Sequence, residues 1–354
     1  MTKAINSIFK VALCALIAFG AASCSDDDDN NFTDNPPVNG NPGTEEKSDE
    51  SAEAYYKGDI YDAGTGNLWV TITKGITYDV AKDDYTGTGY ILCVDFNTTL
   101  AENPDFATIT AGEYTGSADE ESHAMYTLNL ADGESYLNEY TNGEMAAYEF
   151  SDGKATVSMT GSTYTISFNL TTTTGEIKEF TYQGAITPIN LTGEGQMSNL
   201  TSSVSLSDMT QAATFLYGET FTETSDHAIM VIAGPDFDLE SNYGNSPSLM
   251  LGFNITPGAE AVPEGDYTVI NAEEADDYET FTLLSGVYDP AYGGFMGSWY
   301  FNAAKSLQAA MKKGTVSVKH NTDGTYTVSV DLSDGYNNTV KGTYTGKMRI
   351  AVGE

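Results

Sequence analysis

The sequence predicts an all-β protein made of two tandem, related antiparallel β-sandwich or β-barrel domains. Residues 163–170 alternate between apolar and polar side chains, which places the apolar ones on a single face of a strand. Residues 325–332 show the same alternation, and Gly, Asn, Asp and Pro separate the other short apolar segments. A period of two with frequent turn residues is typical of antiparallel sheets and argues against alternating strands and helices.

The chain begins with a targeting segment. Lys3 and Lys10 precede an apolar run over residues 11–19, which is too short to span a membrane and is typical of a signal-peptide core. Small residues then lead into Cys24, and Ser25 and four aspartates follow it: Asp26, Asp27, Asp28 and Asp29. An ordinary secreted protein could share the small residues, and four aspartates alone could form a solvated tail.

This order of features resembles a bacterial lipobox followed by the surface-export signal of Bacteroidetes lipoproteins. The resemblance covers residues 1–29 only. It implies that residues 1–23 are a lipoprotein signal peptide and that Cys24 carries a lipid such as palmitate. It also implies an outer-membrane protein that faces the extracellular side, although a periplasmic orientation stays open.

The remaining chain divides into a tether, two domains and a linker. Residues 24–53 contain almost nothing apolar, and we expect a flexible acidic tether. An internal repeat then predicts β-domains at residues 54–188 and 208–354, joined by a linker at residues 189–207.

Two pairs of tyrosines mark the repeat. Tyr267 follows Tyr114 by 153 residues and Tyr326 follows Tyr164 by 162, so the second copy is nine residues longer between these positions. The only helix that the sequence suggests falls in this longer part, at residues 302–313, where apolar residues recur at helical spacing before Gly314.

Charge and cysteine content restrict the function. The chain has 51 acidic and 15 basic residues, for a net charge of -36, and Arg349 is its only arginine, so we expect no nucleic-acid partner. Cys93 is the only thiol left if Cys14 is removed and Cys24 is lipidated, and its apolar strand-like context favours a buried side chain over a nucleophile.

Catalytic and metal-binding motifs are missing from the sequence. His123, His227 and His320 stand far apart, and no nucleophile elbow, phosphate-binding glycine loop or zinc-protease motif occurs. We therefore expect no catalytic residues and no cofactor, with a hydrolase as the least favoured function. One alternating acidic segment, with Asp236, Asp238 and Glu240, could bind a structural calcium ion, although an acidic strand end or loop is the favoured interpretation.

The residues from Gly286 to Phe301 carry the candidate ligand site. Aromatic side chains alternate there with Gly, Pro and Asp, which predicts a surface loop in the longer part of the second domain. Such rings could stack on a sugar or on a partner protein, or they could plug the end of the β structure. The candidates for ligand contact are Trp299, Tyr292, Tyr288 and Phe295.

Two non-catalytic classes of function remain open besides the less favoured hydrolase. The chain resembles the tandem β-domain surface lipoproteins of Bacteroidetes, and we expect a non-catalytic binding module, most plausibly for glycan or another extracellular ligand. An adhesin or structural surface component is the alternative, and would show a flat patch or an open sheet edge.

Overall fold

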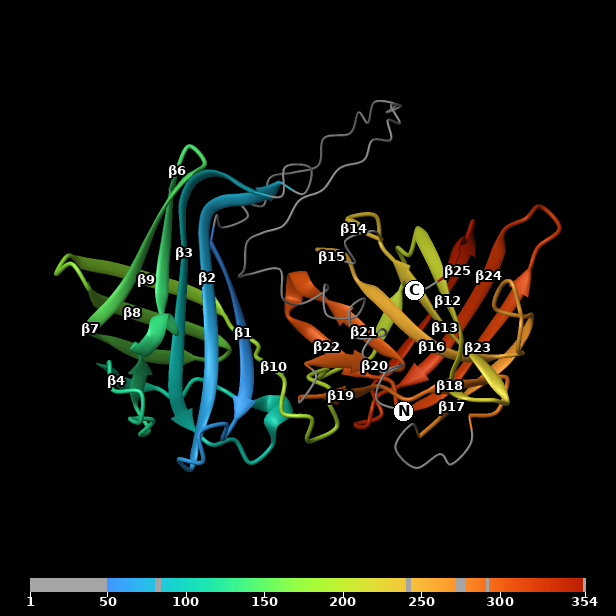
Figure 1. Cartoon of the computed structure of the whole chain (residues 1–354), viewed down its shortest axis with the longest axis horizontal. Coiled ribbons are helices and arrows are strands. Elements are labelled where there is room, and N and C mark those ends of the chain that lie inside the picture. The colour runs from blue at the N-terminus through green and yellow to red at the C-terminus, as the bar shows by residue number, and fades with distance from the viewer. Residues whose placement is uncertain (1–49, 80–83, 240–242, 272–277, 291–292, 353–354) are drawn as a thin grey trace.

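The structure is a computed structural model that describes residues 50–79, 84–239, 243–271, 278–290 and 293–352. These residues form two β-sheet bodies, a closed barrel-like sheet and a curled half-barrel, with short 3-10 turns as the only helical elements among them (Figure 1). The prediction of an all-β protein with two β bodies is therefore confirmed.

The first body is a ten-stranded sheet in which β9 lies beside β1. Its strands follow the order β10-β1-β2-β3-β5-β4-β7-β8-β9, and β6 pairs with both β3 and β7. The strands are β1 (Glu50–Gly58), β2 (Thr65–Asp79), β3 (Asp84–Thr99), β4 (Gly112–Ser117), β5 (Thr127–Asn129), β6 (Tyr136–Thr141), β7 (Glu144–Thr160), β8 (Thr163–Thr172), β9 (Ile177–Ala185) and β10 (Ile189–Asn190).

The second body is a twelve-stranded sheet with the main order β11-β25-β24-β23-β17-β18-β16-β13-β12-β26, with β21 and β22 attached to β16. Two small hairpins, β14–β15 and β19–β20, stand apart from it. The strands are β11 (Val204–Leu206), β12 (Gln211–Thr222), β13 (Ser225–Ala233), β14 (Phe237–Asp238), β15 (Tyr243–Gly244), β16 (Ser248–Ile255), β17 (Gly265–Ile270), β18 (Thr282–Leu284), β19 (Val287–Asp289), β20 (Gly294–Met296), β21 (Trp299–Asn302), β22 (Leu307–Ala310), β23 (Lys313–His320), β24 (Tyr326–Ser333), β25 (Thr339–Gly346) and β26 (Arg349–Val352).

The two bodies repeat the same core packing. Tyr114 and Tyr267 are both fully buried, and each meets a phenylalanine edge-on, Phe96 at 5.1 Å and Phe253 at 4.7 Å between ring centroids. Each tyrosine hydroxyl also donates a hydrogen bond to the backbone carbonyl four residues earlier, at 2.8 and 2.9 Å. The alternating residues of β8 and β24 face these cores, as their sequence period requires.

The segment between the bodies is built into both of them. β10 pairs in parallel with β1, and β11 pairs in parallel with β25. Between these strands, Met197 accepts a hydrogen bond of 2.9 Å from the backbone N–H of Ala310, and Ser198 is fully buried. The expected linker is thus a strap that pairs with both sheets and is buried at residues 197–200.

Two buried carboxylates fix this strap. Asp105 of the first body accepts hydrogen bonds from the Asn190 side chain and the Gln196 N–H, both at 2.7 Å, while Asp334 of the second body accepts one of 2.7 Å from the Ser198 hydroxyl. Hydrogen bonds to charged acceptors contribute about 1.5–3 kcal/mol each, so they restrain the bodies relative to the strap.

The helix predicted at residues 302–313 is wrong. β21 and β22 form a hairpin there, in which Asn302 pairs with Leu307 and Trp299 with Ala310. A short 3-10 turn and Ser306, with a left-handed φ of 49°, reverse the chain. Of the apolar residues at helical spacing, Ala310 and Met311 are buried, Leu307 is half-buried and Ala303 is exposed, so they do not form one buried helical face.

Candidate functional site

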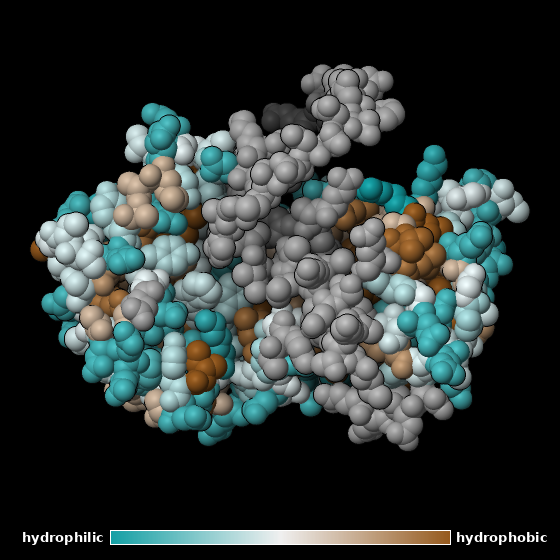
Figure 2. Space-filling model, in the orientation of Figure 1, coloured by the Kyte–Doolittle hydropathy of each residue, from teal (hydrophilic) through white to brown (hydrophobic). Residues whose placement is uncertain are grey.

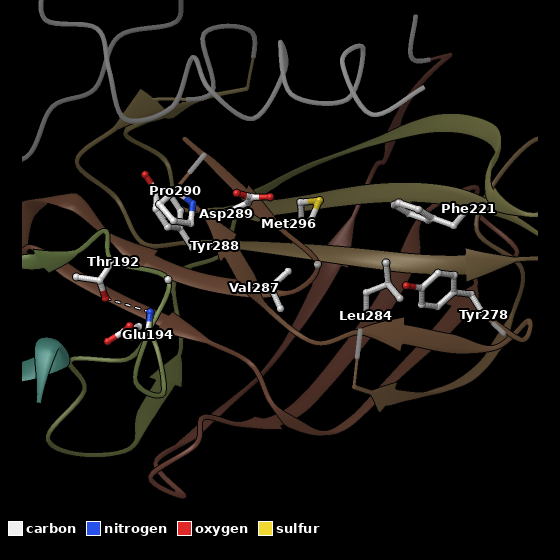
Figure 3. Close-up of a pocket in the computed structure, with 12 residues that line it drawn as sticks. Thr192, Glu194, Phe221, Tyr278, Leu284, Val287, Tyr288, Asp289, Pro290 and Met296 are labelled. Atoms are coloured by element: carbon white, nitrogen blue, oxygen red, sulfur yellow. Dashed lines mark hydrogen bonds between the residues drawn. The ribbon is translucent and has the colours of Figure 1, made fainter. Parts of the chain in front are cut away.

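The second body carries an open groove of about 410 Å³. Phe221, Tyr278 and Leu284 lie at one end, and Tyr288, Asp289 and Pro290 lie at the other, with Val287 and Met296 between them (Figure 3). Thr192, Gly193 and Glu194 from the strap complete the second end, and Gly297 contributes to the wall.

Aromatic contacts build the first end of the groove. Phe221 closes β12, and Tyr278 precedes β18 in the chain. Their rings meet edge-on at 5.4 Å, and the hydroxyl of Ser225 donates a hydrogen bond of 2.5 Å to the Tyr278 carbonyl. Both rings remain partly exposed, so they can present apolar surface to a ligand.

The strap supplies the polar end. The side-chain oxygen of Asn190 accepts hydrogen bonds from both the N–H and the hydroxyl of Thr192, and the Thr192 hydroxyl accepts one from the Glu194 N–H at 3.0 Å. At Gly193, φ is +77°, and a Cβ atom would lie 3.0 Å from the Pro290 ring. The tight turn therefore requires glycine and rests directly against the β19–β20 hairpin.

The expected aromatic surface loop is mostly buried β structure, and the prediction of Trp299 as a surface ligand contact is wrong. Trp299 lies in β21, is 0% exposed, and donates a hydrogen bond of 2.7 Å from Nε1 to the Met296 carbonyl. Its ring stacks on Phe301 and meets Phe295 edge-on at 4.8 Å, and Phe295 itself is buried. Trp299 and Phe295 support the groove from behind.

The other two aromatic candidates differ. Tyr288 is half-buried, lines the groove, and packs against Phe295 at 4.7 Å between centroids. Tyr292 lies outside the described residues. Tyr288 is therefore the sequence-based candidate that the structure places at the groove, and the sequence missed Phe221, Tyr278 and Thr192.

The first body has the same site in a closed form. Leu128 pairs with Phe96 as Leu283 pairs with Phe253, so the next residues, Asn129 and Leu284, occupy equivalent positions. By the same register, Asp95 corresponds to Gly252, Asn67 to His227, and His123 to Tyr278. This correspondence is the signal through which the sequence repeat could have located the groove.

Side chains fill the site in the first body. Tyr61 stacks on His123 with ring centroids 3.6 Å apart, as a counterpart of the Phe221–Tyr278 pair. Both oxygens of Asp59 accept backbone N–H bonds, at 2.8 and 2.9 Å, and these fix the loop that carries Tyr61. Beneath the stack, Asp95 accepts a hydrogen bond of 2.5 Å from Asn67. In the second body Gly252 has no side chain at the Asp95 position, and the backbone of Gly297 packs there instead, 3.1 Å from where a Cβ atom would lie.

Burial shifts the pKa of two buried residues, Asp95 in the first body and His227 in the second. Desolvation raises the pKa of Asp95 from 3.8 to about 6, although Lys57 and the Asn67 amide oppose the shift. Burial lowers the pKa of His227 from 6.5 to about 4, so this imidazole is neutral at pH 7. His227 lies directly behind the groove, with its ring 4.9 Å from that of Phe221.

The groove is acidic. Glu194 and Asp289 line its polar end, and no lysine, arginine or histidine occurs among its described lining residues. Desolvation and then the Asp289 charge raise the pKa of Tyr288 above its ordinary value. The arrangement provides partly exposed rings, hydroxyl groups and negative charge.

The calcium prediction receives no support from the part of the chain that the structure describes. Asp236 lies in a turn and Asp238 in β14, whereas Glu240 falls outside the described residues. Among the described residues, no group of three or more His, Cys, Asp or Glu could hold a metal ion.

Cys93 is buried, and desolvation raises the pKa of its thiol.

The targeting segment, Cys24 and residues 25–29 also lie outside the described residues. Within the described ranges, no helix has the length and apolar character needed to cross a membrane. Comparisons with protein-family models, with curated proteins and with solved structures found no match.

Proposed function

We propose that this protein is a lipid-anchored surface protein whose second body binds a glycan in the groove. The observation that carries the proposal is the combination of three partly exposed rings, Phe221, Tyr278 and Tyr288, with the hydroxyl and carboxylate groups of the strap and hairpin. Aromatic faces pack on the apolar faces of sugar rings, and polar groups at the rim can bind sugar hydroxyls.

The surface of the protein suits such a role outside the cell. Figure 2 shows that the described part of one face is mostly hydrophilic, with apolar patches of limited size. The net charge of -36 favours solubility and repels an anionic cell surface. Membrane attachment would come from the lipid on Cys24, and the acidic run from Asp26 to Asp29 would direct export to the outside.

A glycan array with the purified protein tests the binding role. Tyr288→Ala and Phe221→Ala should each weaken binding by about 1–3 kcal/mol, by analogy with the stacking of bases on aromatic side chains. Tyr326→Ala, at the start of β24, is the matched control and should retain affinity. Binding that survives both groove substitutions, or an array without any bound glycan, would refute the proposal.

An adhesive or structural role is the second candidate, and one observation favours it. β26 lies at the end of the second sheet, with Ile350 43% and Val352 81% exposed. An exposed strand edge can accept a strand from a partner. Val352→Lys should abolish any self-association seen in analytical ultracentrifugation, while a protein that is monomeric at all concentrations would speak against this role.

A further inference from the structure

We propose that Lys57 and Asn67 of the first body become joined by an isopeptide bond, with Asp95 as the group that transfers the protons. The bond links the side chains of β1 and β2 next to the loop that connects these strands. The inference is independent of the groove in the second body. It is carried by an amine, an amide and a buried carboxyl group that lie on one face of the first sheet.

The strand pairing places the amine beside the amide. The register of β1 and β2 shifts between Tyr56 and Gly58, and Gly58 pairs with Asn67, so Lys57 lies in a β-bulge next to Asn67. The Lys57 ammonium lies over the ring of Trp69, 4.6 Å from its centroid. Trp69 and Asn67 are two residues apart in β2 and therefore share a face of the sheet. The Lys57 ammonium is thus on the face that carries the Asn67 amide.

The second body shows that a side chain at this bulge reaches its neighbour. By the register of β12 and β13, Tyr217 is the counterpart of Lys57. Its ring lies 6.2 Å from that of His227, the counterpart of Asn67. The second body has neither the lysine nor the asparagine at these positions, so the reaction is confined to the first body.

Asp95 is placed to act on the amide. It is 1% exposed and accepts a hydrogen bond of 2.5 Å from the Asn67 side chain. Desolvation raises the pKa of Asp95 to about 6, and the charge of the nearby Lys57 lowers it. A carboxyl group with such a pKa can accept and return a proton near neutral pH, as general acid–base catalysis requires.

The carbonyl of Asn67 lacks a hydrogen-bond donor. Its Oδ1 atom is buried and has no partner among the described residues, which is costly for a polar atom in a protein interior. A protonated Asp95 supplies the missing donor once the amide turns, and it thereby polarises the carbonyl for attack. Asn129 also donates to Asp95, at 3.4 Å, but its Oδ1 already accepts the Ala131 N–H at 3.2 Å. Asn67 is therefore the amide that reacts.

The reaction releases one ammonia and needs no other reactant. The Lys57 ammonium gives a proton to the Asp95 carboxylate, and the neutral Nζ attacks Cγ of Asn67. The Nζ–Cγ bond forms and the Cγ–Nδ2 bond breaks. The nitrogen leaves as ammonia together with the proton that Asp95 held, so Asp95 ends as it began. No atom is oxidised or reduced.

Mass spectrometry of the purified full chain tests the bond. Trypsin should fail to cut after Lys57, and the peptide that contains it should be lighter than its sequence by the mass of one ammonia. Asp59 and Asp62 lie between the joined residues, and after cleavage at either aspartate the two fragments should stay together. Loss of ammonia from Asn67 alone would leave the fragments separate, so this digest distinguishes the two reactions.

Three variants locate the chemistry. Lys57→Arg keeps a cation over Trp69 and should abolish the bond. Asp95→Asn should slow its formation about a hundred-fold, within the range for general acid–base catalysis. Lys74→Arg is the matched control, because Lys74 is an exposed residue of β2 that pairs with Glu50 at 3.5 Å, and it should form the bond as the wild type does. Circular dichroism of each variant separates loss of the bond from loss of the β fold.

Each contrary result overturns a stated part of the proposal. A wild-type protein that trypsin cuts fully after Lys57 has no isopeptide bond there. Fragments that stay joined in a folded Lys57→Arg protein would place the cross-link on other residues. Equal rates of bond formation in Asp95→Asn and the wild type would remove Asp95 from the reaction.

Discussion

The hydroxyl of Tyr336, in the second body, donates a hydrogen bond of 2.9 Å to the carboxylate of Asp105, in the first. Asp105 is only 2% exposed and also binds the strap through Asn190 and Gln196. A buried carboxylate that loses a donor is costly, so this contact couples the stability of one body to the other.

Tyr336→Phe should therefore destabilise the protein by about 1.5–3 kcal/mol, the range for hydrogen bonds to charged groups. Differential scanning calorimetry should show the unfolding transitions of the two bodies moving apart. Tyr326 begins β24, at the end of the strand that is far from Asp334 and the strap. Tyr326→Phe is therefore the matched control. Superimposable traces for Tyr336→Phe and the wild type would contradict a coupling through Asp105.

Trp299→Ala should lower the free energy of unfolding by about 3–5 kcal/mol, because it removes a fully buried ring that packs against Phe295 and Phe301. Its melting temperature should fall sharply, whereas Tyr288→Ala should change the melting temperature little. A thermal melt of both variants checks this, and an undisturbed Trp299→Ala protein would show that the side chain has no structural role.

Asp95→Asn should change how stability depends on pH. The native pKa of about 6 lies above the ordinary aspartate pKa of 3.8, so the native state binds the proton more tightly than the unfolded state. Stability from this group is therefore present at low pH and is lost as pH rises from about 4 to 6, by about 3 kcal/mol. The variant should lack this loss in urea titrations at several pH values, and parallel pH profiles would contradict the assignment.

His227→Asn should have the opposite effect. The native pKa of about 4 lies below the ordinary histidine pKa of 6.5, so the wild type loses about 3 kcal/mol of stability as pH falls through this interval, and the variant should not. Asparagine is the residue at the equivalent position in the first body, Asn67, which makes it a conservative choice. The same urea titrations apply, with Asn67→Gln as the comparison.

If Cys24 carries the proposed lipid, Cys24→Ala should release the protein from membranes, because acyl chains contribute about 0.8 kcal/mol per buried methylene and an acidic segment after Cys24 would add no attraction. Replacement of Asp26 to Asp29 by alanine should leave the protein membrane-bound but remove its accessibility to protease in whole cells. Fractionation and protease protection measure the two effects. A Cys24→Ala protein that stays with the membrane would eliminate the lipid anchor.

The regular strands could be predicted because their burial is periodic. β8 and β24 bury alternate residues, and both alternations are visible in the sequence. β10 and β11 could not be found this way, since two or three residues are too few to show a period. Their place is decided by partners distant in the sequence.

The groove was only partly predictable, because glycine occurs both in loops and where two backbones pack closely together. Gly286 and Gly297 among aromatic residues suggested a loop, but a Cβ at Gly286 would lie 2.5 Å from the Ser298 carbonyl oxygen and 2.8 Å from Ala310. Here glycine allows two backbones to pack closely. Phe295, between these glycines, and Trp299, just after them, are therefore core residues, whereas Tyr288 reaches the groove from the rim of the hairpin.

β10 pairs in parallel with β1, and β11 pairs in parallel with β25. These two pairings limit how recombination can rearrange the architecture. A gene fragment that ends at residue 188 would encode a first sheet without the strand that covers β1, and a fragment that begins at residue 208 would encode a second sheet without the strand that covers β25. Each body keeps a complete edge only if the exchanged piece includes residues 189–206. The pair of bodies, rather than either one, is the unit that could be inherited, shuffled or grafted intact.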